Sequence, residues 1–134
     1  MSLQEYSVFI DKLISAPSKS LPVLRERLEF LEGHESKPNL SLLLTGALGL
    51  SSETGEFNEI VKKICFQGKP LNEENLYHAK RELGDVLWYW TATCLALGFD
   101  PEDVMAENRL KLSKRFPTGS FSVENSEHRA ANDL

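Results

Sequence analysis

Apolar residues along this chain recur mainly at the spacing of an α-helix. Tyr6, Phe9 and Leu13 are three or four residues apart, so they share one face of a short helix that stops before a proline. A second short helix is predicted over residues 21–32, and residues 33–39 are typical of a polar connector. Alternating apolar and polar runs, which would indicate strands, are hard to find. The pattern predicts an all-α fold, an antiparallel bundle of about five helices.

The middle of the chain predicts one long helix. Its helical pattern covers about residues 41–66 and contains Gly46, Gly49 and Gly55. Each glycine inside a helix costs roughly 1 kcal/mol of stability relative to alanine. The three glycines therefore predict close packing or the close approach of a ligand, or else a break in the helix near residues 50–52.

Turn residues divide the second half of the chain. Residues 67–71 contain glycine and proline and interrupt the helical pattern. A helix is predicted over residues 72–97, because capping residues lie at its start and Gly98 supplies its stop. An aspartate followed by a proline begins a last helix, over residues 100–116. The polar tail, residues 118–134, is predicted to be ordered only where it docks.

The longest apolar-rich run, residues 86–99, is apolar on nearly every side of its predicted helix. Its 14 residues are too few to cross a bilayer as a helix. A helix that is apolar all round is expected to be buried all round. In a chain this small, the simplest way to bury it is contact with another subunit, so we expect a homo-oligomer.

The composition excludes some classes of partner. A chain of 134 residues with 41% apolar residues is expected to be one domain. We expect that domain to consist of amino-terminal helices over residues 1–40, the helices that carry the candidate site over residues 41–117, and the tail. The net charge of −5 argues against nucleic acid and membrane surfaces as partners, because both are normally bound through a basic excess.

The cysteines and the amino terminus indicate a cytoplasmic protein. Cys65 and Cys94 lie within apolar stretches, not at the spacing of a metal site or a redox motif. The first residues show no basic region followed by a long apolar run, which a secretory signal would require. We therefore expect two free thiols and a cytoplasmic location.

Two pairs of carboxylates lie at equal distances on either side of the predicted turn. Glu53 and Glu56 are three residues apart, as are Glu82 and Asp85, so each pair projects to one side of a helix. Glu53 is as far before Lys69 as Asp85 is after it, and Glu56 and Glu82 are related in the same way. In an antiparallel hairpin, the four carboxylates therefore meet at one height. That much negative charge in a partly dry space predicts a bound cation.

The ligand chemistry indicates which cation this would be. Carboxylates without histidine or thiolate suit Mg²⁺, and Mn²⁺ is the second choice. An isolated acidic pair is usually a solvated face, but apolar residues flank Glu82 and Asp85 closely. A di-iron site needs a Glu-x-x-His motif on two helices. Neither acidic pair supplies that histidine, so an oxidoreductase of this type is disfavoured.

Two neighbouring residues have more than one interpretation. His78 is one turn before Glu82, and a surface or capping role is the more common one for such a histidine. Tyr89 is one turn after Asp85 and lies on the acidic face. A hydrogen bond to a ligand and packing in the core are equally good interpretations of this tyrosine.

Basic residues are expected near the carboxylates, because Mg²⁺ held by a few carboxylates takes phosphate oxygens as further ligands. Lys63 is two turns after Glu56 and lies on nearly the same helix face. Lys111 and Arg115 share a face of the last helix, with Asn108 one turn before Lys111. Taken alone, such residues usually face water. Together with the acids they predict a site for a polyphosphate.

At this point the sequence resembles a known family, the all-α nucleoside triphosphate pyrophosphohydrolases of the MazG type. The likeness covers about residues 42–121. It rests on the combination of GLSSETGE at residues 49–56, the two lysines at 62–63, ELGDVLWY at 82–89 and NRLKLSKRFPTG at 108–119. Residues 1–40 match nothing that we can name.

The resemblance implies hydrolysis between the α and β phosphates of a nucleoside triphosphate, giving a monophosphate and pyrophosphate. Members of the family are often dimers or tetramers with sites at subunit contacts, which implies a homodimer or homotetramer here. The implied metal ligands are Glu53, Glu56, Glu82 and Asp85. The implied substrate-binding residues are Lys63, Lys111 and Arg115, to which Tyr89 and Asn108 are added from their positions.

The roles of individual carboxylates stay open at the level of sequence. Glu53 and Glu56 are the candidate catalytic residues. Glu53 is favoured as the base that orients the attacking water, but a role as metal ligand fits it equally well. A rival class of function is a noncatalytic helical module that binds a nucleotide or a protein partner. Loss of some of the acidic or basic residues would favour that class, but here all of them are present.

Overall fold

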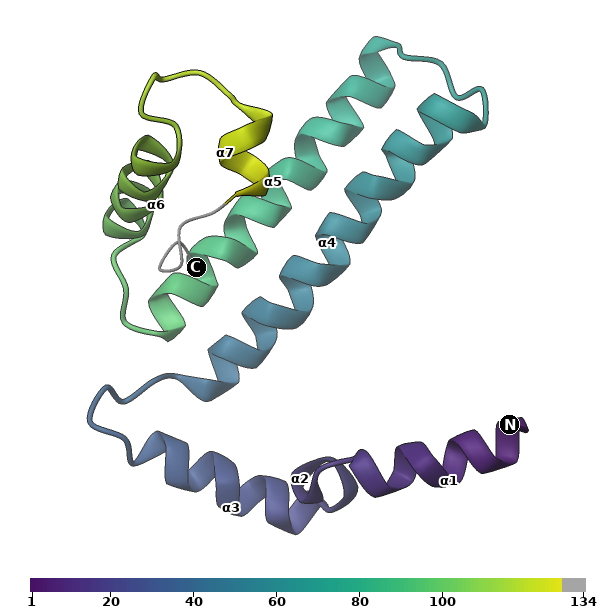
Figure 1. Ribbon diagram of the computed structural model, residues 1–134, viewed down its shortest axis with the longest axis vertical. Coiled ribbons are helices and arrows are strands. Elements are labelled where there is room, and N and C mark those ends of the chain that lie inside the picture. The colour runs from purple at the N-terminus through teal and green to yellow at the C-terminus, as the bar shows by residue number, and fades with distance from the viewer. Residues whose placement is uncertain (129–134) are drawn as a thin grey trace.

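The computed structural model describes residues 1–128, and the regular secondary structure in that range is entirely helical (Figure 1). The prediction of an all-α fold is confirmed. Five helices longer than ten residues correspond to the five expected from sequence, and two short helices are added. The helices are α1 (Leu3–Leu13), α2 (Ala16–Lys19), α3 (Leu21–Glu32), α4 (Leu40–Phe66), α5 (Glu73–Ala96), α6 (Pro101–Arg115) and α7 (Val123–Glu127).

The central unit is an antiparallel hairpin of the two longest helices, α4 and α5, which we call the hairpin (Figure 1). The Asn39 side chain caps α4 by accepting a hydrogen bond from the Leu42 amide at 3.0 Å. The Asn72 side chain caps α5 in the same way. The Asn75 side chain donates to the Pro70 carbonyl oxygen at 2.7 Å and ties the turn to α5. These side-chain caps explain why both helices begin within a residue of their predicted positions.

Two glycines let the helices of the hairpin approach closely. A Cβ atom on Gly46 would lie 3.3 Å from the Thr93 Cα atom and overlap the Thr93 hydroxyl, and one on Gly49 would overlap the Tyr89 ring. A Cβ atom on Gly55 would meet nothing within 4 Å. The close-packing interpretation is therefore confirmed for Gly46 and Gly49. The alternative of a break near residues 50–52 is wrong, because α4 is continuous from Leu40 to Phe66.

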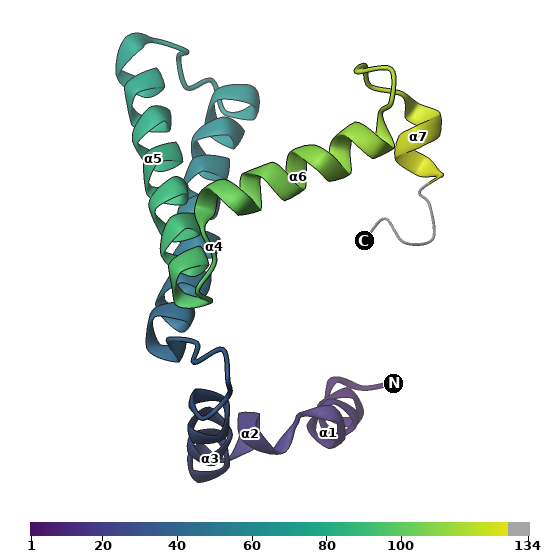
Figure 2. The same ribbon diagram turned by 90° about the vertical axis from the view of Figure 1, so that its left-hand side faces the viewer.

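Helix α6 leaves the hairpin at a steep angle, and α7 lies beyond its far end (Figure 2). Gly98 takes φ of 74°, a conformation that costs glycine little, and ends α5 as predicted. The Asp100 side chain accepts a hydrogen bond from the Glu102 amide at 2.9 Å and begins α6. The short helix α7 was not predicted, and it is capped by Ser122. The predicted order of the tail beyond residue 128 lies outside the described residues.

The amino-terminal segment forms an arm, residues 1–32, which comprises α1, α2 and α3 and lies beyond the base of the hairpin (Figures 1 and 2). The helix over residues 21–32 has the predicted bounds. Helix α2 was missed because its proline occupies a first-turn position, where proline starts a helix as readily as it stops the previous one. No residue of α1, α2 or α3 is buried.

The core of the described chain is small and lies wholly in the hairpin. Its buried apolar residues are Leu40, Ile60, Ala92, Cys94 and Ala96. Cys94 is buried and Cys65 exposed, and both are free thiols, as expected. None of the helices in residues 1–128 is both long enough and apolar enough to cross a membrane.

Candidate metal centre

Three of the four predicted carboxylates meet between α4 and α5. Glu53 on α4 and Glu82 and Asp85 on α5 each place a carboxylate oxygen within 4.8 Å of the others. We call these three residues the acidic cluster. The meeting of Glu53 with Asp85 follows from their equal distances from the turn. Glu56 lies outside this group, and its side chain is exposed. The structure thus brings together three of the four residues at the predicted height.

Burial differs sharply among the three carboxylates. Glu82 is only 7% exposed, whereas Glu53 is half-buried and Asp85 is exposed. Glu82 faces α4 because Asn75 and Ala96, which lie at helical intervals from it, are buried on the same side of α5. A buried carboxylate is costly unless it has a partner of opposite charge or a hydrogen-bond donor.

His78 supplies one such partner. Its Nε2 atom lies 3.0 Å from the Glu82 Oε1 atom, one helical turn away on α5. The side chain of His78 is 52% exposed, so the surface location expected from sequence is correct. Its contact with the most buried carboxylate of the cluster was not the favoured interpretation. The spacing of four residues, which is evident in the sequence, places the two side chains on one face but does not by itself show that they touch.

Burial and the neighbouring carboxylates both act on the pKa of Glu53. Partial burial raises the pKa of the Glu53 carboxyl, and the negative charges of Glu56, Asp85 and Glu82 raise it further. Glu56 therefore acts electrostatically on the cluster even though it lies outside it. A cation bound among these carboxylates would remove the repulsion that raises this pKa.

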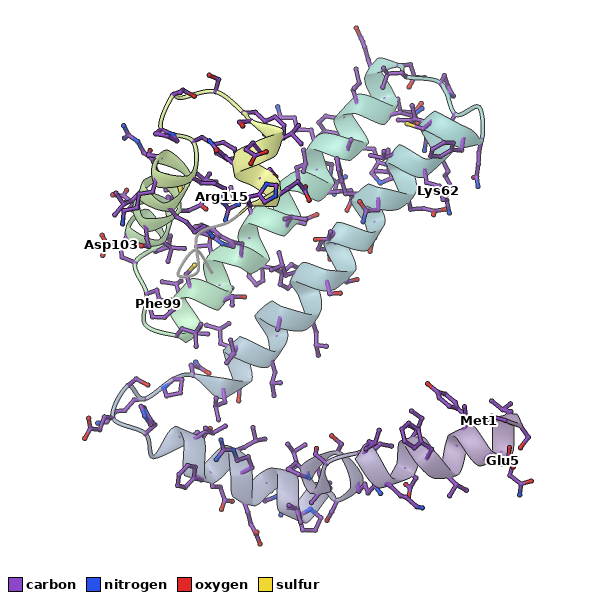
Figure 3. The ribbon with its side chains drawn as sticks, viewed as in Figure 1. Met1, Glu5, Lys62, Phe99, Asp103 and Arg115 are labelled. Carbon is purple, nitrogen blue, oxygen red and sulfur yellow. The ribbon has the colours of Figure 1, made fainter. Side chains whose placement is uncertain are left out.

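Lys63 is held by a residue that the sequence reasoning did not assign to the site. Its Nζ atom lies 3.2 Å from the Glu59 Oε1 atom, and Lys62 also pairs with Glu59. Hydrogen bonds from Lys62 and Lys63 lower the pKa of the Glu59 carboxyl. Figure 3 places Lys62 near the turn of the hairpin. The spacing of Glu59 and Lys63, four residues in the favourable order, was the available signal for this pair.

Tyr89 packs inside the hairpin. Its ring lies against Gly49 and makes an edge contact with Trp88, with ring centroids 4.7 Å apart. The ring is half-buried. This arrangement is the one expected of an aromatic in the core, which was one of the two interpretations from sequence.

The predicted substrate residues of α6 are not brought to the acidic cluster within one chain. Helix α6 points away from the hairpin (Figure 2), and Arg115 is its last residue. Asn108 and Lys111 instead line a groove where α5 and α6 meet. Trp90 and Phe99 contribute to the same groove. Sequence spacing placed these residues on a common helix face, but it did not predict how α6 is oriented relative to the hairpin.

The donor set fits a hard divalent cation. Three carboxylates from two facing helices offer oxygen ligands without competing nitrogen or sulfur atoms, apart from His78 at the edge. Mg²⁺ and Mn²⁺ prefer such ligands. Without a cation, the closeness of these carboxylates contributes to the raised pKa of Glu53. The chemistry that this arrangement supports is the polarisation of a phosphate oxygen and of a water molecule.

Comparison with known proteins adds one finding. A protein-family model described as the MazG nucleotide pyrophosphohydrolase domain matches residues 43–120. The match spans more than half of the chain and includes all but the first turn of the hairpin, the acidic cluster and the whole of α6. Comparisons with curated proteins and with solved structures found no match.

Proposed function

Because this chain belongs to the MazG nucleotide pyrophosphohydrolase family, we propose that it is a Mg²⁺-dependent hydrolase of nucleoside triphosphates. It cleaves the anhydride bond between the α and β phosphates, adds one water molecule across that bond, and releases a monophosphate and pyrophosphate. The observation that carries the proposal is the meeting of Glu53, Glu82 and Asp85 inside the segment that defines the family.

In this proposal the acidic cluster holds the cation. Glu82 is the best fixed of the three ligands, because it is buried and contacts His78. Mg²⁺, with Mn²⁺ as a substitute, supplies polarisation of the phosphate and lowers the pKa of a bound water. Glu53 and Glu56 are the residues that could accept the proton of the attacking water. Glu53 suits this role because it lies beside Glu82 and Asp85, where a metal-bound water would be held.

Basic side chains would hold the phosphates and stabilise the charge on the departing pyrophosphate. Lys63 is the candidate from the hairpin, kept in place by Glu59. Lys111, Arg115 and Asn108 are the candidates from α6. Since α6 points away from its own hairpin, we propose that these three residues serve the acidic cluster of a second copy. The functional unit would then be a homodimer or a homotetramer.

The decisive experiment measures pyrophosphate release from a panel of canonical and modified nucleoside triphosphates with Mg²⁺. We expect release by the wild type and a loss of about 100-fold or more in the Glu56→Gln and Asp85→Asn variants. Glu74→Gln, an exposed substitution on the same helix as Asp85, is the matched control and should keep full activity. Absence of release from every nucleotide, or release unaffected by both test substitutions, would refute the proposal.

The rival function is a noncatalytic module that binds nucleotide or a protein partner. Calorimetric titration of the same nucleotides distinguishes it from the enzyme. Saturable binding without any release of pyrophosphate would support the module, whereas turnover would exclude it.

A further inference from the structure

Within residues 1–128, the arm is folded but makes few contacts with the hairpin, among them contacts of α3 with α4. α1 and α3 have only 11 and 12 residues, and isolated helices of this length are marginal in water. Ser2 and Glu5 form a complete capping box at the start of α1, but a cap contributes only about 1 kcal/mol. The stability of the arm must therefore come from packing of its apolar residues.

Those apolar residues are exposed in the single chain. Phe9 is 52% exposed and Phe30 is 68% exposed. Tyr6, Phe9 and Leu13 form one face of α1, and none of the residues of the arm is buried. Figure 3 shows Met1 and Glu5 at an end of the arm that is far from the hairpin. Within residues 1–128, the arm thus presents an apolar face that no other helix covers.

The hairpin presents a second apolar surface that is exposed in the described part of the chain. The exposed apolar residues of α5 recur at helical spacing on the side opposite buried Glu82. We call this set the outer stripe; it consists of Leu76, Tyr77, Leu83, Leu87, Trp88 and Leu95. From its first to its last residue the outer stripe spans roughly 30 Å along the helix. The apolar faces of α1 and α3 together require a surface of similar length.

The area exposed by the chain indicates what covers these surfaces. The chain exposes 10820 Å², whereas a compact monomer of 15.1 kDa would expose roughly 7,100 Å². The excess of about 3,700 Å² per chain is larger than the roughly 1,000–2,500 Å² that each partner buries in an obligate dimer. Contact between two hairpins alone would leave part of this surface uncovered, so the arm must be covered as well.

The arm is directed away from its own hairpin by the way its connector begins (Figures 1 and 2). The Asn39 amide donates a hydrogen bond to the Ala96 carbonyl oxygen at 2.8 Å, which fixes the start of α4 to the end of α5. The short connector, residues 33–39, departs from this fixed point and directs the arm away from the hairpin (Figures 1 and 2). A second copy of the chain offers the same hairpin without this restriction.

We infer that the arm, residues 1–32, is exchanged between copies of this chain. It packs its apolar face on the hairpin of a second copy. The arm lies outside the segment that matches the family. The inference is independent of the catalytic proposal, because it concerns the arm, the outer stripe and the exposed area alone. It assigns to residues 1–32 the role of holding the assembly together.

Cross-linking of mixed chains tests where the arm lies. Unlabelled and ¹⁵N-labelled chains are refolded together, and intact mass confirms that mixed oligomers form. A lysine-specific cross-linker then joins nearby amines. Lys12 and Lys19 report on the arm, and Lys62 and Lys80, both exposed, report on the hairpin. We expect arm-to-hairpin cross-links that join one labelled and one unlabelled peptide. Arm-to-hairpin cross-links confined to one isotope, or none at all while other cross-links form, would overturn the inference.

Substitutions in the full-length chain test whether the arm contributes to assembly. The Phe9→Ser/Leu13→Ser variant removes the apolar face of α1, and Gln4→Ser/Lys12→Ser is the matched control on its polar face. We expect the apolar variant to raise the dissociation constant of the oligomer at least tenfold, with the control unchanged. Equal dissociation constants for the two variants would contradict the inference. A monomeric wild type whose arm binds phospholipid vesicles would also overturn it.

Discussion

Glu53 is the carboxylate on which the charges of the acidic cluster converge. Its pKa is raised by partial burial and by Glu56, Asp85 and Glu82, so the metal-free native state holds its proton more tightly than the unfolded state does. For such a group, the free energy of unfolding falls as pH rises from the unfolded pKa through the folded pKa. The stability is regained on acidification. Glu53 should therefore lower the free energy of unfolding of the metal-free protein near neutral pH. A bound cation would offset this repulsion.

This reasoning predicts how Mg²⁺ affects thermal stability. Saturating Mg²⁺ should raise the melting temperature more at pH 7.5 than at pH 5, because protons compete with the cation for the same carboxylates. Differential scanning fluorimetry at both pH values measures the effect. In Glu53→Gln the pH dependence of the Mg²⁺ effect should shrink. An equal Mg²⁺ effect at both pH values in the wild type would argue against a cation at the acidic cluster.

His78 is expected to affect metal binding through Glu82, the carboxylate that it contacts. Its Nε2 atom is 3.0 Å from Glu82, and groups that orient metal ligands typically contribute a factor of about 10 to 100 in metal affinity. We expect His78→Ala to weaken Mg²⁺ binding about tenfold in a calorimetric titration, and His78→Gln to restore part of the loss. The exposed His34, on the connector, provides a control in His34→Ala. Unchanged affinity in His78→Ala would show that the contact does not orient Glu82.

The individual side chains of the site were only partly predictable. Helical spacing and equal distances from the turn placed Glu53, Glu82 and Asp85 together, because a helical hairpin leaves little freedom in register. The same symmetry also included Glu56, which lies outside the group. Spacing fixes height along the hairpin but not the direction of a side chain around its helix. The contact of Glu82 with His78 depends on that direction.

Within the helices, the glycines of α4 serve different purposes. Gly46→Ala should lower the free energy of unfolding by about 1–3 kcal/mol, because the new Cβ atom would press on the Thr93 backbone. Gly55→Ala meets nothing within 4 Å and should raise it by about 0.5–1 kcal/mol through helix propensity. Urea denaturation of the two variants measures both changes in the free energy of unfolding. Equal effects would mean that the close approach of α4 and α5 at Gly46 is not needed for stability.

Helix boundaries were the most predictable feature at this scale. Asn39, Asn72 and Asp100 cap their helices with their own side chains, and Gly98 ends α5 with a positive φ. These are local interactions, so the sequence encodes them directly. Helix α7, with five residues, was missed because so short a segment shows no periodicity.

The whole molecule is unusually open for a chain of its length. Among residues 1–128, the few buried apolar residues all lie in the hairpin, and the outer stripe and the arm are exposed. We predict that sedimentation at micromolar concentration will give a mass that is a multiple of 15.1 kDa, with a melting temperature that rises with protein concentration. A stable monomer with a concentration-independent melting temperature would contradict this prediction.

The sequence by itself determined the helical class, most helix boundaries and the meeting of acids from two helices. Each of these follows from local spacing, capping or the register of a single turn. Only the tertiary structure decided which carboxylates converge, that Gly46 and Gly49 serve close packing, and that α6 and the arm point away from the hairpin. Those features depend on side-chain direction and on the angles between helices, which are set by contacts between residues distant in the chain and not by local periodicity.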